Sequence, residues 1–79
     1  MPTPEIIQRV RELHAELKAQ PDPAKQQDVL RQLETVMLEP QHAPHYKSLS
    51  DKLLELEVDH PKLAGSVQQL VELLSSAGL

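Results

Sequence analysis

The sequence predicts an all-α protein of four helices arranged as two antiparallel helical hairpins. Apolar residues recur every three or four positions in four segments, which is the period of a helix with one buried face. Prolines separate these segments. The chain has 79 residues and a single aromatic side chain, so aliphatic residues must build the core. We expect one small domain over residues 1–79.

The first helix is predicted over residues 4–19. Thr3 precedes Pro4, and a hydroxyl N-cap followed by proline at the first helical position is a typical helix start. The inner face has a spacing of four, three and four: Ile6, Val10, Leu13 and Leu17. Pro21 disfavours the helical conformation of Gln20 and so ends this helix.

The second helix is predicted over residues 23–39, and Asp22-Pro23 repeats the start signal. Its inner face carries Val29, Leu30, Leu33, Val36 and Met37. Because the link to the first helix is so short, we expect the two helices to be antiparallel neighbours.

Residues 40–47 are predicted to be a linker, since Pro40 and Pro44 exclude a continuous helix. A third helix follows over residues 48–58. Ser48 with Asp51 three residues later resembles a capping box. The buried face of this helix carries Leu49, Leu53 and Leu56, with Tyr46 one turn earlier.

The fourth helix is predicted over residues 61–77, with Asp59 or His60 as its cap and Pro61 in its first turn. Leu63, Val67, Leu70 and Leu74 repeat the four-three-four spacing of the first helix. A glycine inside a helix costs about 1 kcal/mol relative to alanine. Gly65 therefore suggests the close approach of another backbone.

The apolar faces of these helices are broader than one hairpin could bury. One arrangement is a four-helix bundle within the monomer. The other is self-association through the first hairpin, with the remaining helices packed on or beside it. We expect a homodimer that completes the bundle.

Composition narrows the function classes. Eight basic and twelve acidic residues give a net charge of −4, which opposes unspecific binding to nucleic acid or to an anionic membrane. The absence of cysteine removes disulfides and thiolate chemistry. No apolar run approaches the length of a membrane span, and charged residues occur throughout the first helix. We expect a cytoplasmic protein.

Catalytic motifs are not found. Two glycines are too few for a phosphate-binding or dinucleotide-binding loop. The serines lie in or at the ends of helices rather than in a nucleophile elbow. Acidic residues that occur in pairs have the spacing expected of side chains on the solvent-exposed surface of a helix. We therefore expect neither an enzyme nor a bound cofactor.

The four histidines are the side chains that titrate near neutral pH. His42 and His45 flank Ala43-Pro44, but zinc needs three or four protein ligands. We expect solvated loop histidines, with metal binding as an alternative. His14 is interpreted as a boundary residue or as a pH-sensitive interface contact. His60 is expected to cap the fourth helix or to hydrogen-bond to Glu57, with an acid–base role as the alternative.

A nucleic-acid-binding regulator is a further alternative. The second helix offers a set of residues that could read DNA: Lys25, Gln26, Gln27, Arg31 and Gln32. Asp28 and Glu34 interleave them, which favours a solvated polar face.

The main functional hypothesis is a non-catalytic protein–protein interaction or self-association module, with a homodimer or an unidentified protein as partner. Its surface would consist of apolar residues left over after the core forms. The candidate residues are Ile7, His14, Leu38, Leu54, Val58 and Leu73.

Three segments of the chain carry a resemblance to a known family. They are residues 11–17 (RELHAEL), residues 56–63 (LEVDHPKL) and residues 73–79 (LLSSAGL). Together they resemble the short proteins of the domain-of-unknown-function family numbered 4404. The most specific element is the corner formed by Glu57, His60, Pro61 and Leu63. The family leads us to expect an aromatic residue where Leu56 stands. The resemblance implies a bacterial, cytoplasmic, helical protein, and it transfers no catalytic or ligand-binding residue.

Overall fold

A computed structural model describes residues 3–21, 26–39, 41 and 45–77. Within these residues the chain forms four α-helices and no strand. The helices are α1 (Pro4–Lys18), α2 (Gln27–Leu38), α3 (Tyr46–Asp59) and α4 (Ala64–Ser76), and one turn of 3-10 helix, η3 (Pro61–Leu63), leads into α4. The prediction of an all-α chain is confirmed.

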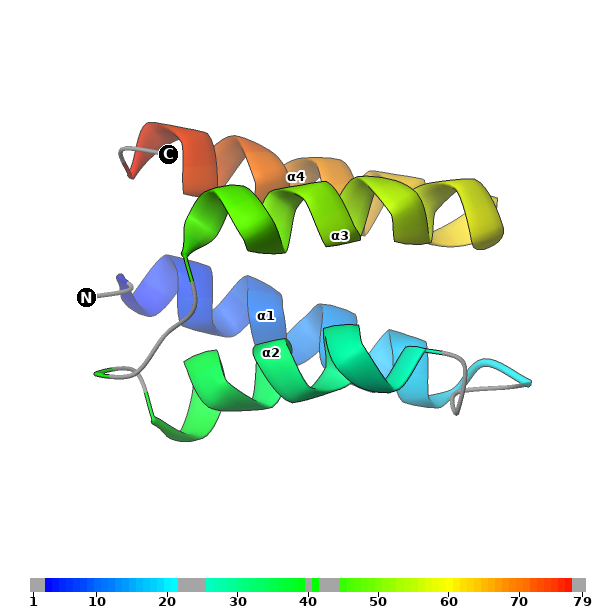
Figure 1. Cartoon of the computed structure of the whole chain (residues 1–79), viewed down its shortest axis with the longest axis horizontal. Coiled ribbons are helices and arrows are strands. Elements are labelled where there is room, and N and C mark those ends of the chain that lie inside the picture. The colour runs from blue at the N-terminus through cyan, green and yellow to red at the C-terminus, as the bar shows by residue number, and fades with distance from the viewer. Residues whose placement is uncertain (1–2, 22–25, 40, 42–44, 78–79) are drawn as a thin grey trace.

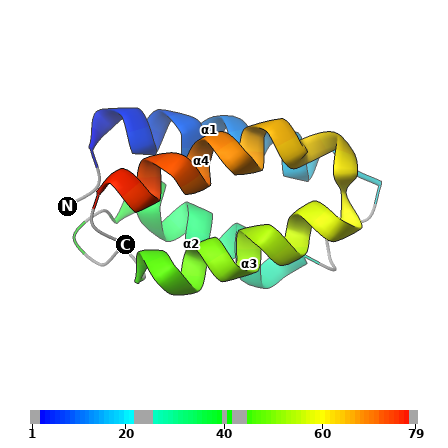
Figure 2. The same ribbon diagram turned by 90° about the horizontal axis from the view of Figure 1, so that it is seen from above.

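The helices form two layers, with α4 over α1 and α3 over α2 (Figures 1 and 2). Each helix packs against two neighbours: α1 contacts α2 and α4, and α3 contacts α4 and α2. Successive helices run in opposite directions, so α1 begins and α4 ends at the same end of the bundle. Of the two arrangements considered from the sequence, the structure has the four-helix bundle within one chain.

The core of the bundle is aliphatic and draws on every helix. Its buried side chains are Ile6, Val10, Leu13, Leu17, Val29, Leu30, Leu33, Val36, Leu49, Leu53, Leu56, Leu63, Val67, Leu70 and Leu74. Both four-three-four stripes are buried, because that spacing keeps side chains on one side of a helix. Tyr46, the single aromatic residue, is partly buried against this core.

The start and end of α1 agree with the predicted signals. Thr3 is the N-cap, and its Oγ1 accepts a hydrogen bond of 3.2 Å from the backbone N–H of Ile6. Pro4 occupies the first turn, where its missing N–H costs nothing. The helix ends at Lys18, with Ala19 as the C-cap.

The start of α2 differs from the predicted residue 23. The helix begins at Gln27, with Gln26 as the N-cap residue and no side-chain cap. The predicted Asp22-Pro23 cap lies outside the described residues. Val29 is the first buried residue of α2, so the polar residues before it add nothing to the core.

The start of α3 also differs from the prediction. The helix begins at Tyr46, and His45 is the N-cap residue without a side-chain hydrogen bond. The predicted capping box of Ser48 and Asp51 is therefore wrong, because Ser48 lies inside the first turn and is exposed. Packing of Tyr46 against the core accounts for the earlier start.

The prediction for Gly65 is also wrong. This residue is exposed, and a Cβ built on it would meet no heavy atom within 4 Å. Gly65 therefore gives α4 no packing advantage over alanine.

Candidate interaction surface

The six residues predicted to form an interaction surface do not lie together. Ile7 and Leu73 are partly buried and pack against the core. Among the described residues, the exposed large apolar side chains are Leu38, Leu54 and Val58, with exposed fractions of 75%, 48% and 79%. Leu38 is the last residue of α2, at the opposite end of the bundle from the end of α3 (Figure 1). Leu54 and Val58 lie one turn apart on α3.

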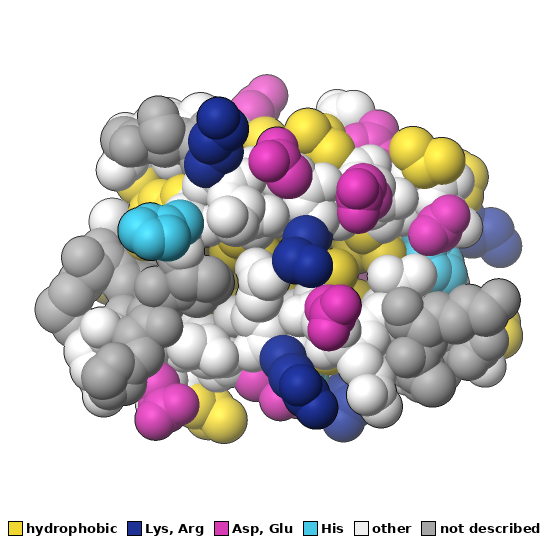
Figure 3. All heavy atoms as spheres, in the orientation of Figure 1, with side chains coloured by type: hydrophobic (Ala, Val, Ile, Leu, Met, Phe, Trp, Pro, Cys, Tyr) yellow, Lys and Arg dark blue, Asp and Glu magenta, His cyan; other side chains and the backbone are white. Residues whose placement is uncertain are grey.

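Leu54 and Val58 lie one turn apart on α3, away from its buried residues. A separation of four positions places them on the same face of the helix. In Figure 3, hydrophobic side chains reach the surface over α3 and are interspersed with acidic side chains. Asp51, Glu55 and Asp59 supply exposed acidic groups on this helix. The outer face of α3 therefore combines an apolar pair with charge.

His14, the sixth candidate, makes a contact within the chain. Its Nε2 lies 3.1 Å from Glu34 Oε1, and its side chain is mostly covered. The contact joins α1 to α2. This placement agrees with a boundary histidine, although its polar partner is a carboxylate rather than water alone. The sequence pattern gives no sign of Glu34, because periodicity within one helix does not reveal which residues of the next helix lie beside it.

The family corner joins α3 to α4. His60 is the N-cap residue of η3, its backbone carbonyl accepts a 2.9 Å hydrogen bond from Leu63, and Pro61 occupies the first turn. Leu63 is buried. Leu56, where an aromatic residue was expected, is also buried, so a leucine fills that place in the core.

Both predicted contacts of the His60 side chain are wrong. The ring makes no capping hydrogen bond, and Glu57 instead accepts a 3.2 Å hydrogen bond from Gln68 Nε2 on α4. His60 Nε2 lies 3.4 Å from the Gln26 amide nitrogen. That amide can donate to the ring nitrogen when it carries no proton. His60 thus connects the α3–α4 corner to the start of α2.

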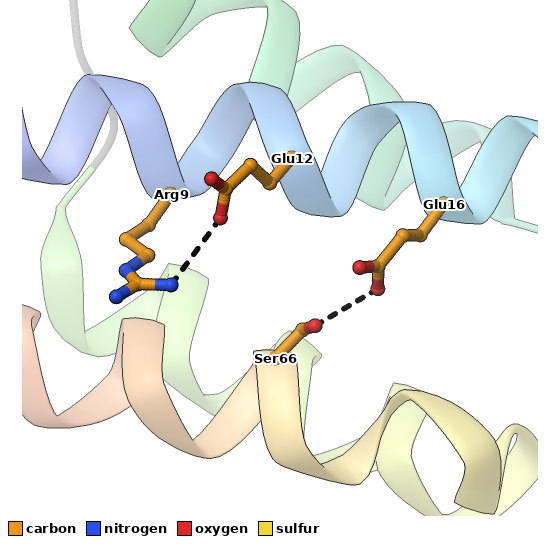
Figure 4. A network of polar contacts seen from close by, with 4 residues as sticks. All are labelled: Arg9, Glu12, Glu16 and Ser66. Carbon is orange, nitrogen blue, oxygen red and sulfur yellow. Dashed lines mark hydrogen bonds and ion pairs between the residues drawn. The ribbon is translucent and has the colours of Figure 1, made fainter.

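Polar contacts on the α1–α4 side hold surface residues of this chain together (Figure 4). Ser66 Oγ donates a 2.9 Å hydrogen bond to Glu16 Oε2, which links α4 to α1. Arg9 pairs with Glu12 at 3.3 Å along α1. Both pairs are exposed, and such pairs contribute about 1 kcal/mol or less.

Shallow grooves run between neighbouring helices. The groove between α2 and α3 has a volume of about 240 Å³, and Val29 and Leu56 contribute to its floor. Asp28 and Lys52, which also line it, approach each other at 4.0 Å. Two buried polar atoms, Gln32 Oε1 on α2 and Ser50 Oγ on α3, have no hydrogen-bond partner within the described part of the chain. The contact between α2 and α3 is also the smallest of those between neighbouring helices.

Metal binding and nucleic-acid binding remain alternatives from the sequence. His42 lies outside the described residues, and His45 is exposed at the start of α3. In the described part of the chain, no three or more His, Asp or Glu residues are grouped so that they could hold a metal ion. On α2, Arg31 and Gln27 are exposed, whereas Gln32 turns its carbonyl oxygen inward. Lys25 lies outside the described residues.

The fold and surface together define a small antiparallel four-helix bundle with an exposed apolar pair on one helix. The chain belongs to the family described as "Domain of unknown function (DUF4404)", whose model matches residues 6–79. Searches of curated proteins and of solved structures returned no match. Among the described residues, no helix is both long and apolar enough to cross a membrane.

Proposed function

We propose that the protein is a non-catalytic protein–protein interaction module that binds its partner through the outer face of α3. The observation that carries this proposal is the exposure of Leu54 and Val58, one turn apart on the same face. Each square ångström of apolar surface removed from water contributes roughly 25 cal/mol. This pair therefore favours burial against another surface.

The bundle does not need these two residues for its own core. Every helix already buries a set of aliphatic side chains within the chain. Single exposed apolar residues are common and need no explanation, and Leu38 at the end of α2 is an example. Leu54 and Val58 differ from Leu38 because they lie together on one helix face, and a contiguous exposed apolar patch marks an interaction surface.

The experiment that tests this proposal compares three tagged versions of the protein in the cells that produce it. They are the unaltered protein, the double variant Leu54→Lys/Val58→Lys and the matched control Leu38→Lys. We expect the unaltered protein and the control to retain the same partners, including untagged copies of the chain. We expect the double variant to lose them while keeping its helical circular dichroism. Equal capture by all three versions would contradict the proposal.

The cellular location is also part of this proposal. The family resemblance implies a bacterial cytoplasmic protein, and we place the interaction there. Fractionation of the native cells should recover the chain with cytoplasmic markers. Recovery with the membrane or the periplasm would contradict this placement.

A further inference from the structure

The outer face of α3 carries four exposed residues with a spacing of four, three and four: Lys47, Asp51, Leu54 and Val58. We call them the α3 stripe. This spacing keeps them on one side of the helix. It also reads the same in both directions along the chain. A second α3 lying antiparallel therefore places position 47 level with position 58, and position 51 level with position 54.

The charges of α3 run against the preference of an isolated helix. Negative side chains are stabilising near a helix N-terminus and positive ones near its C-terminus. The first turn of α3 contains Lys47 and no acidic residue, and the last turn contains Asp59 and no basic residue. Glu55 adds an exposed negative charge to the C-terminal half. The helix is thus positive at its start and negative at its end.

An antiparallel second copy reverses this order. Lys47 of each copy then lies level with the acidic C-terminal half of the other, where Glu55 and Asp59 are exposed. The terminal charges, which are unfavourable within one helix, become complementary between two, while Asp51 of each copy lies level with Leu54 of the other. The same pairing covers the apolar residues of the stripe.

We infer that the partner of the α3 outer face is a second copy of this chain, bound antiparallel along the α3 stripe. This inference rests on the proposed function. Leu54 of each copy lies level with Asp51 of the other, and the two Leu54 side chains lie on either side of the centre of the pair, about 4.5 Å apart along the helix axis. Val58 lies beneath the aliphatic part of Lys47 from the other copy. Each Lys47 ammonium group pairs with Glu55 and Asp59 of the opposite copy.

The size of this surface sets the strength of the dimer. α3 has 14 residues, so it is about 21 Å long. Pairing along one helix of this length gives a small interface, in the range of transient complexes. The dimer is therefore expected to dissociate in the micromolar range or above, and to weaken as salt screens the paired charges.

Charge reversal tests the pairing directly. Sedimentation equilibrium gives the dissociation constant of the unaltered chain, of Lys47→Glu and of Glu55→Lys/Asp59→Lys. Each variant alone should self-associate at least about tenfold more weakly, because like charges then face each other. An equimolar mixture should restore association close to the original strength, since both ends of the mixed dimer are complementary. A parallel dimer, or one formed on another surface, would not show this rescue.

Further variants separate the interface from folding and from the proposed function. Leu54→Asp should abolish the dimer, because it removes the central apolar side chain and places a carboxylate level with Asp51 of the other copy. Leu38→Asp is the matched control and should leave the dissociation constant unchanged. An unaltered chain that stays monomeric at about 1 mM, or a mixture without rescue, would overturn the inference. If cellular capture still depends on Leu54 and Val58 in that case, the proposed function stands with a different partner. Self-association with the predicted rescue supports both.

Discussion

The helices α1 and α3 bury similar stripes but differ at their ends and on their outer faces. α1 has a side-chain cap at Thr3, an acidic residue in its first turn and a basic residue in its last turn. α3 has no side-chain cap, and its terminal charges are reversed. It also exposes Leu54 and Val58. The comparison shows that α1 is arranged for the stability of its own helix, whereas α3 depends on the bundle and keeps its outer face available.

The largest expected effect tests the similarity of the two inner faces. Leu13 of α1 and Leu53 of α3 are both fully buried. Replacing either by alanine should lower the free energy of unfolding by about 2–5 kcal/mol, through lost burial and a residual cavity. Urea denaturation of dilute protein measures this change. Leu54→Ala is the matched control on α3, and it should change the value by about 0.5 kcal/mol or less. If Leu54→Ala lowered the free energy of unfolding as much as Leu53→Ala does, Leu54 would belong to the core and not to an exposed outer face.

The next effect concerns how the two helices begin. Thr3→Ala removes the side-chain hydrogen bond to Ile6 and should cost about 1 kcal/mol of stability. Ser48→Ala should cost nothing and is expected to add a few tenths of a kcal/mol, since alanine has the higher helix propensity. Thermal unfolding of the two variants at equal concentration checks this. A loss for Ser48→Ala as large as that for Thr3→Ala would restore the capping-box interpretation.

The smallest expected effect sharpens the contrast in terminal charge. In the dilute monomer at low salt, Lys47→Glu and Asp59→Lys should each raise the free energy of unfolding by about 0.3–1 kcal/mol. The mirror changes in α1, Glu5→Lys and Lys18→Glu, should lower it by similar amounts. Chemical denaturation with and without added salt measures these shifts, and salt should reduce all four. If Lys47→Glu and Asp59→Lys both lowered the free energy of unfolding, the terminal charges of α3 would not be unfavourable within one chain.

The sequence was sufficient for most of the fold, because helical period and proline positions act locally. The two four-three-four stripes are both buried, and α1 begins and ends where Thr3, Pro4 and Pro21 indicate. The beginning of α3 was missed because Tyr46 gains packing that no local start signal records.

The candidate surface was predictable only in part. Hydrophobic period gives the direction of a side chain on its helix, but not how far two neighbouring helices cover it. Ile7 and Leu73 are covered in this way, whereas Leu54 and Val58 are not. Contacts between helices, such as those from Gln26 to His60 and from Gln68 to Glu57, depend on the relative height of the helices. Period alone does not specify that height.

The most direct test of the α3 outer face is a dilution series of isotope-labelled protein, followed through its backbone amide chemical shifts. Between about 1 mM and about 10 µM, shifts should change for residues 47–59 while those of α1 stay constant. Lys47→Glu should suppress the changes. Changes centred on α1 or on the α1–α4 side would contradict the account, as would spectra independent of concentration.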